Sequence, residues 1–212
     1  MRTIRTLGLF ACIYLILCAL GGFFLVEGAL HPFKRELPQQ TFRRAAVIAK
    51  QMNASLKDIS IPATDGIILK AWYFDESPHS NNTVILFHGL GDNRKGMIGY
   101  IPLFLRNGYN VLTPDWRAHG ESGGELVTYG IKEKADVTSW INWLQNSTDS
   151  RKYYALGESY GAAVLLQSLQ NENRFWAVAA ESSFATFREA AYDRGGQFIR
   201  SSDFAGRTIF FP

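Results

Sequence analysis

The hydrophobic pattern of this chain begins with one long apolar stretch and continues as short apolar runs separated by polar or amphipathic segments. No charged residue occurs from Leu7 to Val26, a stretch of 20 residues. A helix of that length rises about 30 Å, which matches the thickness of the hydrocarbon layer of a bilayer. We therefore expect residues 1–27 to form an N-terminal membrane anchor.

A cleaved signal peptide is the alternative for this segment. The apolar region of a signal peptide usually runs about 7 to 15 residues and ends in a small-x-small cleavage site. The stretch here is longer, and Val26-Glu27-Gly28 fits such a site poorly. Processing as a lipoprotein at Cys18 fits less well still, because bulky Leu17 precedes that cysteine. Length favours an uncleaved anchor.

Basic residues flank the anchor on both sides, so the charge count leaves its orientation open. Arg2 and Arg5 precede it, and four basic residues follow it, namely Lys34, Arg35, Arg43 and Arg44. Long C-terminal domains are translocated largely regardless of such charges. We therefore expect a single-pass protein with its N-terminus inside and its domain on the extracytoplasmic side.

Residues 28–56 are expected to contain a linker and an amphipathic helix. Pro32 and Pro38 mark the linker, and apolar side chains recur at spacings of three and four between Gln39 and Met52. Such a helix either packs on the folded domain, which is the commoner case, or lies on the bilayer with its basic residues toward anionic headgroups.

The remaining residues, 57–212, predict an α/β domain. Two alternating segments joined by Thr64-Asp65-Gly66 indicate a β-hairpin. The later apolar runs are continuous, which is typical of strands buried on both faces. The predicted elements are hairpin strands at 58–62 and 67–74, strands at 83–87, 110–113, 153–156 and 176–180, and helices at about 95–106, 131–146 and 160–171. Alternating strands and helices predict a mostly parallel sheet.

Charge and cysteine content exclude several functions. Up to residue 55 the chain has seven Lys or Arg and two acidic residues, whereas the rest has fifteen and seventeen. The basic excess therefore belongs to the N-terminal region, and we expect no nucleic-acid partner. Cys12 and Cys18 both lie in the apolar stretch. The domain thus has no thiol for a disulfide, a zinc site or a cysteine nucleophile.

A serine nucleophile is indicated by Gly157-Glu158-Ser159-Tyr160-Gly161, which fits the pattern G-x-S-x-G. A predicted strand ends just before the motif and a predicted helix follows it. This context places Ser159 on the sharp strand-to-helix turn on which hydrolases present a nucleophile. Small residues are needed around it because the backbone is strained and the helix passes close to the strand.

An oxyanion hole is indicated by His88-Gly89-Leu90-Gly91, which follows the strand predicted at 83–87. Acyl transfer builds negative charge on the substrate oxygen, and preorganised backbone N–H groups stabilise that charge. We expect the N–H groups of Tyr160 and Leu90 to be the two donors.

A third motif, Asp115-Trp116-Arg117-Ala118-His119-Gly120-Glu121-Ser122-Gly123, follows the next strand. With these three motifs in this order, the chain resembles the α/β-hydrolase family, in its serine-aminopeptidase-like and monoacylglycerol-lipase-like branch. The resemblance covers about residues 57–185 and implies an α/β-hydrolase fold. It also implies structural roles for His88, Asp115 and Arg117, and for His119 a place in the loop under the oxyanion hole rather than a role as catalytic base.

The chain departs from that family in its triad. In the family an acid and then a histidine follow the nucleophile along the sequence. No histidine occurs after His119, and the other two are His31 near the anchor and His79 in a loop. Glu181 and Asp203 are acids with only weak positional support. We therefore expect a C-terminally truncated hydrolase domain, incomplete and inactive as this chain, with neither the triad acid nor its histidine identified.

These observations predict a membrane-anchored serine hydrolase that acts on a carboxylic ester, amide or peptide bond through an acyl-Ser159 intermediate. The expected partners are a small-molecule or peptide substrate and, through the N-terminal helix, membrane lipid; no metal or organic cofactor is expected. A non-catalytic α/β-hydrolase-like membrane protein that binds a ligand or partner is the alternative. A transport or structural membrane protein does not fit, because only one segment is long enough to span a bilayer.

Overall fold

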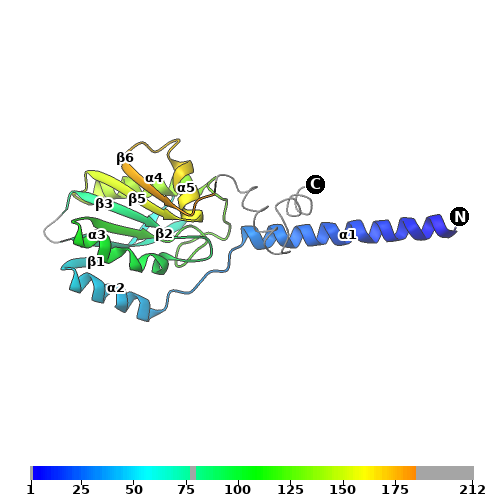
Figure 1. The fold of residues 1–212 in the computed structure, drawn as a ribbon, viewed down its shortest axis with the longest axis horizontal. Coiled ribbons are helices and arrows are strands. Elements are labelled where there is room, and N and C mark those ends of the chain that lie inside the picture. Colours follow the sequence, from blue (N-terminus) through cyan, green and yellow to red (C-terminus); the bar gives the residue numbers. More distant parts are fainter. Residues whose placement is uncertain (1, 77–79, 185–212) are drawn as a thin grey trace.

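The computed structural model describes residues 2–76 and 80–184 (Figure 1). A long N-terminal helix projects from a domain in which helices cover both faces of a six-stranded sheet. The helices are α1 (Arg2–Leu30), α2 (Gln39–Gln51), the 3-10 helix η1 (Arg94–Gly99), α3 (Ile101–Arg106), α4 (Glu133–Ser147) and α5 (Tyr160–Ser168). The strands are β1 (Ala54–Pro62), β2 (Ile68–Glu76), β3 (Asn82–Phe87), β4 (Asn110–Pro114), β5 (Lys152–Glu158) and β6 (Phe175–Glu181).

The sheet has the strand order β1-β2-β4-β3-β5-β6. β1 and β2 form the predicted antiparallel hairpin, and β2 is also antiparallel to β4. The strands β4, β3, β5 and β6 are parallel to one another. The prediction of a mostly parallel sheet is thus confirmed. Because parallel strands end at the same edge, the loops after β3, β4 and β5 meet there, and these loops hold all three motifs.

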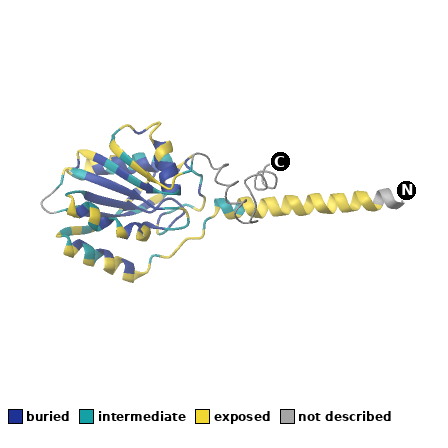
Figure 2. Cartoon of the chain, viewed as in Figure 1, coloured by how far each residue is buried: buried dark blue, intermediate teal, exposed yellow. Residues whose placement is uncertain are grey.

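Two hydrophobic cores lie on opposite faces of the sheet, as the two-residue period of strands requires. In β3, Ile85 and Phe87 belong to the core under α4 and α5, whereas Val84 and Leu86 belong to the core under α2, η1 and α3. The continuous apolar run of β3 therefore supplies both faces, and Figure 2 shows the central strands of the sheet as mostly buried.

Helix α2 packs on the domain rather than lying apart from it. Ala45 and Ala49 are buried, and the ring of Phe42 meets the ring of Trp72 edge-on at 6.0 Å. The small side chains let the helix approach the sheet closely. Of the two expectations for this segment, packing against the domain is confirmed.

The single helix predicted at 95–106 is wrong, because the segment divides into η1 and α3. Gly96 and Gly99 lower the helix propensity of the first half, and Pro102 lies in the first turn of α3. Proline suits that position because its missing N–H would have no helical partner there. The sheet also begins earlier than expected, at Ala54 rather than Asp58.

The prediction that every later strand is buried on both faces is wrong for β6. Five of its seven residues are exposed, and the exposed fraction of Trp176 is 64%. β6 lies at the edge of the sheet and pairs only with β5 within the described residues. Its apolar composition reflects a strand in the sheet but does not determine what covers it.

Helix α1 contains the predicted apolar stretch and is exposed along nearly its whole length (Figure 2). Residues Thr6–Leu30 are long and apolar enough to cross a membrane, a property that N-terminal signal sequences share. The linker that follows extends from His31 to Pro38.

Candidate active site

Ser159 lies on the bend between β5 and α5, at the carboxyl edge of the sheet. Its backbone has φ 52° and ψ −111°, a conformation that a residue with a side chain rarely adopts. The Ser159 N–H donates to the carbonyl of Glu181 at the end of β6, at 2.8 Å. The bend is therefore tied to the neighbouring strand, which holds the strained conformation.

The two glycines of G-x-S-x-G are required by close backbone contacts. A Cβ at Gly161 would lie 2.5 Å from the carbonyl oxygen of Phe87, and one at Gly157 would lie 2.6 Å from the nitrogen of Ala162. The first turn of α5 therefore packs directly on the ends of β3 and β5. Any larger residue at either position would have to displace main chain.

The glycine-rich loop after β3 lies beside Ser159. A Cβ at Gly89 would be 3.7 Å from the Cβ of Ser159, in ordinary van der Waals contact. Leu90 follows with its side chain 46% exposed, and Gly91 has φ +68°. The N–H of Tyr160 lies in the first turn of α5, where helical N–H groups have no intrahelical acceptor. The structure thus brings Ser159, the Leu90 loop and the start of α5 together.

His88 and His119 are both buried and both hold loops. Nε2 of His88 accepts from the N–H of Trp116 at 3.1 Å, and Nε2 of His119 accepts from the N–H of Gly91 at 3.0 Å. The Nδ1 atoms lie 2.8 Å from the carbonyl of Gly89 and 2.9 Å from that of Arg117, respectively. Each ring is therefore the neutral tautomer with its proton on Nδ1. His119 fixes Gly91 and so shapes the loop that carries Leu90.

Burial keeps these two rings neutral. It lowers the pKa of His88 to about 4, and it lowers that of His119 to about 4 with a further contribution from His88 itself. With Nε2 already accepting a hydrogen bond, neither ring offers a free lone pair to take a proton from Ser159. This geometry fits the structural roles that the family resemblance implies.

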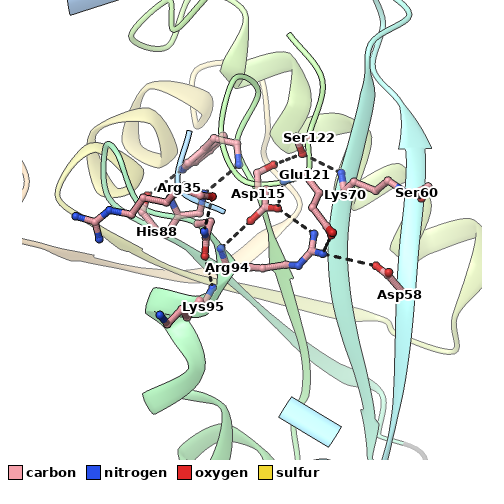
Figure 3. A network of polar contacts seen from close by, with 12 residues as sticks. Arg35, Asp58, Ser60, Lys70, His88, Arg94, Lys95, Asp115, Glu121 and Ser122 are labelled. Atoms are coloured by element: carbon pink, nitrogen blue, oxygen red, sulfur yellow. Dashed lines mark hydrogen bonds and ion pairs between the residues drawn. The ribbon is translucent and has the colours of Figure 1, made fainter. Parts of the chain in front are cut away.

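Asp115 and Arg94 form a buried ion pair beneath the loop (Figure 3). The Asp115 carboxylate accepts from Nη1 of Arg94 at 2.9 Å, from the N–H of Arg94 at 2.7 Å and from the N–H of Glu121 at 2.9 Å. The Arg94 guanidinium also bonds Glu121 and lies over the ring of Trp72. One carboxylate therefore ties the loop after β3 to the loop after β4. Arg94 was missed by the sequence reasoning, although it lies three residues beyond the glycine-rich motif.

Arg117 joins the β4–α4 loop to two other elements. It donates to both carboxylate oxygens of Asp136 in α4, at 2.8 and 2.7 Å, and to Asp65 in the β-hairpin turn at 2.9 Å. The bond from Arg117 lowers the pKa of Asp65. Bidentate pairing of this kind fixes the orientation of the guanidinium.

A buried carboxylate, Glu133, lies behind the candidate nucleophile and was also missed. It accepts from the N–H of Thr128 at 2.7 Å, from the hydroxyl of Thr128 at 2.7 Å and from the N–H of Gly130 at 2.8 Å. Burial, together with this carboxylate, raises the pKa of Tyr160 far above its usual range. The ring of Tyr160 also packs against His119 and Tyr129. The signal for Glu133 was an acidic residue in the first turn of a predicted helix, a common helix-end feature.

The other sequence candidates lie as follows. Glu181 ends β6, and its carboxylate accepts from the hydroxyl of Tyr100 at 2.7 Å, which raises the Tyr100 pKa to about 12. His31 is exposed at the end of α1, where it pairs with Glu27. His79 and Asp203 lie outside the described residues. Within residues 2–76 and 80–184, no group of three or more His, Cys, Asp or Glu side chains is arranged to hold a metal ion.

The comparisons with known proteins place the chain in a family. Residues 82–209 match the family model of the alpha/beta hydrolase fold. The structure is similar to that of esterase Pf2001 from Pyrococcus furiosus, with a TM-score of 0.69, 26% identity, and coverage of 85% of this chain and 68% of that chain. Another crystal form of the same esterase gives a TM-score of 0.66 and 29% identity, and covers 77% of this chain and 64% of that one.

Sequence relatives match over about half of this chain. Uncharacterized protein YqkD of Bacillus subtilis is 39% identical over 108 residues, which are 50% of this chain and 35% of that protein. Uncharacterized protein Rv2307c of Mycobacterium tuberculosis is 28% identical over 111 residues, which are 51% of this chain and 39% of that protein. The matched segment thus spans little more than a third of either relative. By its family match and its fold, the chain belongs to the alpha/beta hydrolases.

Proposed function

We propose that this chain is a membrane-anchored serine hydrolase with Ser159 as nucleophile and the N–H groups of Tyr160 and Leu90 as oxyanion donors. The observation that carries the proposal is the strained bend at Ser159, which lies at the N-terminus of α5 beside the loop that contains Gly89. An ordinary strand-to-helix turn does not need a serine at φ 52°. The similarity to esterase Pf2001 supports hydrolysis of a carboxylic ester; amide and peptide bonds follow the same chemistry.

In the proposed reaction, Oγ of Ser159 attacks the carbonyl carbon of the substrate, and the C=O electron pair moves onto the oxygen. The two backbone N–H groups stabilise that oxyanion. The intermediate then expels the alcohol or amine, which leaves with a proton, and water later releases the acid from the acyl-serine. Both steps need a base for the proton of the attacking hydroxyl.

The base is the part of the machinery that the described residues do not supply. His88 and His119 use Nε2 in loop hydrogen bonds, and His31 lies at the start of the linker after α1, where it pairs with Glu27. Glu181 is near the site, since its carbonyl accepts from the Ser159 N–H, but its carboxylate bonds Tyr100. We therefore propose that this chain by itself has little or no steady turnover.

A non-catalytic binding protein is the second candidate function, and the engagement of both buried histidines favours it. A fluorophosphonate probe distinguishes the two, because it needs only a single attack by a serine beside an oxyanion hole and its fluoride leaves without a proton. Slow labelling is therefore expected even where steady turnover is not. For the hydrolase we expect labelling of the full chain that is lost in Ser159→Ala. Absence of labelling would overturn the hydrolase proposal and favour the binding protein.

Turnover is tested separately with a p-nitrophenyl ester. We expect no steady release of p-nitrophenol above that of Ser159→Ala. Steady release that depends on Ser159 would show that the chain contains a base and would overturn the proposed inactivity.

We further propose that α1 is an uncleaved anchor and that the domain, residues 57–212, lies on the extracytoplasmic side. The length and apolar composition of α1 support the anchor. Resistance of the chain to extraction by alkaline carbonate tests it, and digestion of the domain by protease added to intact cells tests the side. Release by carbonate, or protection from the protease, would contradict the respective proposal.

A further inference from the structure

The end of the anchor is held against the same sheet edge that carries Ser159. The carbonyl of Ala29 accepts from the hydroxyl of Tyr129 at 2.8 Å, and the carbonyl of Leu30 accepts from the N–H of Val127 at 2.8 Å. Both partners belong to the β4–α4 loop. Figure 1 shows α1 leaving the domain from this point. The C-terminal end of α1 is therefore hydrogen-bonded to the domain, at the rim of the candidate site.

The linker continues along this edge. Nζ of Lys34 donates to the carbonyl of Ser122 at 2.9 Å, and the carbonyl of Arg35 accepts from the side chain of Asn93 at 3.0 Å. The Arg35 guanidinium also lies 3.6 Å from the Asp92 carboxylate. The linker thus bridges the loop after β3 and the loop after β4. We call residues 31–38, 88–93 and 122–131 together the docking face.

Exposed apolar side chains gather on the docking face. The exposed fraction is 84% for Phe33, 46% for Leu90, 44% for Leu126 and 76% for Ile131. Single exposed apolar residues are common on any protein. These four, however, belong to the linker after α1 or to the two loops that contact α1 and the linker, and exposed apolar patches mark surfaces that meet a partner or a membrane.

The length of α1 fixes the depth of this face relative to a bilayer. The uncharged stretch that ends at Val26 matches a hydrocarbon layer of about 30 Å, and each headgroup region adds about 5 to 7 Å. Ala29 lies three residues beyond Val26, or about 4.5 Å along the helix. The Tyr129 hydroxyl bound to Ala29 would therefore lie in the headgroup layer, where tyrosine is enriched in membrane proteins.

We propose that the docking face rests on the bilayer that α1 enters, with Phe33, Leu90, Leu126 and Ile131 inserted among the lipids. Tyr129 then connects lipid and site, because its ring meets that of Tyr160 edge-on at 5.9 Å and Tyr160 follows Ser159. The bilayer is the proposed partner of the docking face, because α1 would hold this face against the membrane that it enters. Where the proposed hydrolase function also holds, the site opens onto lipid and takes an ester whose acyl chain is dissolved in the membrane.

Depth of insertion tests the docking without any need for activity. In the full chain, Cys12 and Cys18 are replaced by alanine and a single cysteine is placed at Ile131 or Leu126. The matched control is Trp176→Cys, an exposed apolar position at the start of β6, at the amino edge of the parallel strands and away from the edge that carries Ser159. Each variant is labelled with a polarity-sensitive fluorophore and reconstituted into vesicles that contain phosphatidylglycerol and nitroxide-labelled lipid. We expect quenching at 131 and 126 and none at 176.

A label on native Cys18, with Cys12 replaced, reports the anchor separately. If the label at Cys18 is quenched while the labels at 131 and 126 are as unquenched as the label at 176, the docking is overturned and the anchor stands. An unquenched label at Cys18 would overturn both. Loss of fluorophosphonate labelling would affect only the hydrolase, because none of these readings depends on chemistry at Ser159.

The proposal that the site takes an ester dissolved in the membrane is tested by a separate measurement. The vesicles carry a long-chain fluorophosphonate, or a short one is added in the water phase, and Ile131→Asp is compared with Trp176→Asp. We expect Ile131→Asp to slow labelling by the long probe roughly tenfold, because a charge at the interface disfavours insertion, while labelling by the short probe stays unchanged. Equal slowing of both probes, slowing of neither, or no labelling at all would overturn this part.

Discussion

The buried carboxylate of Asp115 offers the sharpest test of what holds the candidate site in shape. Asp115 is fully buried and accepts three hydrogen bonds, from the guanidinium and the N–H of Arg94 and from the N–H of Glu121. In Asp115→Ala the Arg94 charge stays buried without this partner. Removal of one member of a buried ion pair typically costs about 3–5 kcal/mol.

The structure places the expected cost at the lower end of that range. Arg94 keeps its bond to Glu121, whose side chain is half-exposed, and it lies 4.0 Å from Asp58. We therefore expect a loss of about 3 kcal/mol in the free energy of unfolding. For a protein of this size that corresponds to a fall in Tm of about 6–12 °C.

The matched control is an ion pair of similar length on the surface. Nζ of Lys57 lies 2.7 Å from the Asp75 carboxylate, but its side chain is 53% exposed. Lys57→Met should cost less than about 1 kcal/mol, because water screens the pair. Thermal and urea unfolding of the full chain in detergent micelles, followed by tryptophan fluorescence, measures both variants. A shift for Asp115→Ala as small as that for Lys57→Met would refute the reasoning.

Three further predictions follow from the site. Gly161→Ala should lower the unfolding free energy by about 1–3 kcal/mol, because the added Cβ would meet the carbonyl of Phe87. Gly99→Ala, with open space around it, is the control and should cost less than half as much. Equal losses of unfolding free energy in the two variants would contradict the close packing at Gly161. Ser159→Gly should raise the unfolding free energy by about 1 kcal/mol through relief of strain and abolish fluorophosphonate labelling, and a drop in stability would argue that the bend is not strained. Stability should be retained above about pH 6.5 and fall as the pH falls toward 4, because the folded-state pKa values of His88 and His119 are depressed to about 4 and the unfolded chain binds the protons more strongly. Between these pH values each histidine changes the unfolding free energy by about 1.4 kcal/mol per pH unit. His119→Gln should therefore reduce the dependence of the unfolding free energy on pH. An unaltered dependence would show that His119 contributes nothing.

Much of the fold follows from local sequence features. The uncharged stretch after Arg5 predicts α1, alternation predicts the hairpin, and continuous apolar runs predict the parallel strands. The bend at Ser159 is also a local feature, because the glycines that the turn needs lie two residues before and two residues after it. Periodicity and backbone conformation depend on residues close along the chain, so a single sequence suffices to read them.

The structure was needed where the deciding contact joins distant residues. Arg94 pairs with Asp115 and His119 with Gly91 because the sheet brings the ends of β3 and β4 to one edge. The bond from Tyr129 to Ala29 joins residues 100 positions apart. The low burial of β6 likewise depends on its place at the edge of the sheet and not on its own composition. The sequence by itself determined the elements and the bend that carries the serine. The packing of those elements decided which buried charges pair, that both buried histidines are committed to loops, and that α1 ends beside the site, since each of these depends on which loops meet in space.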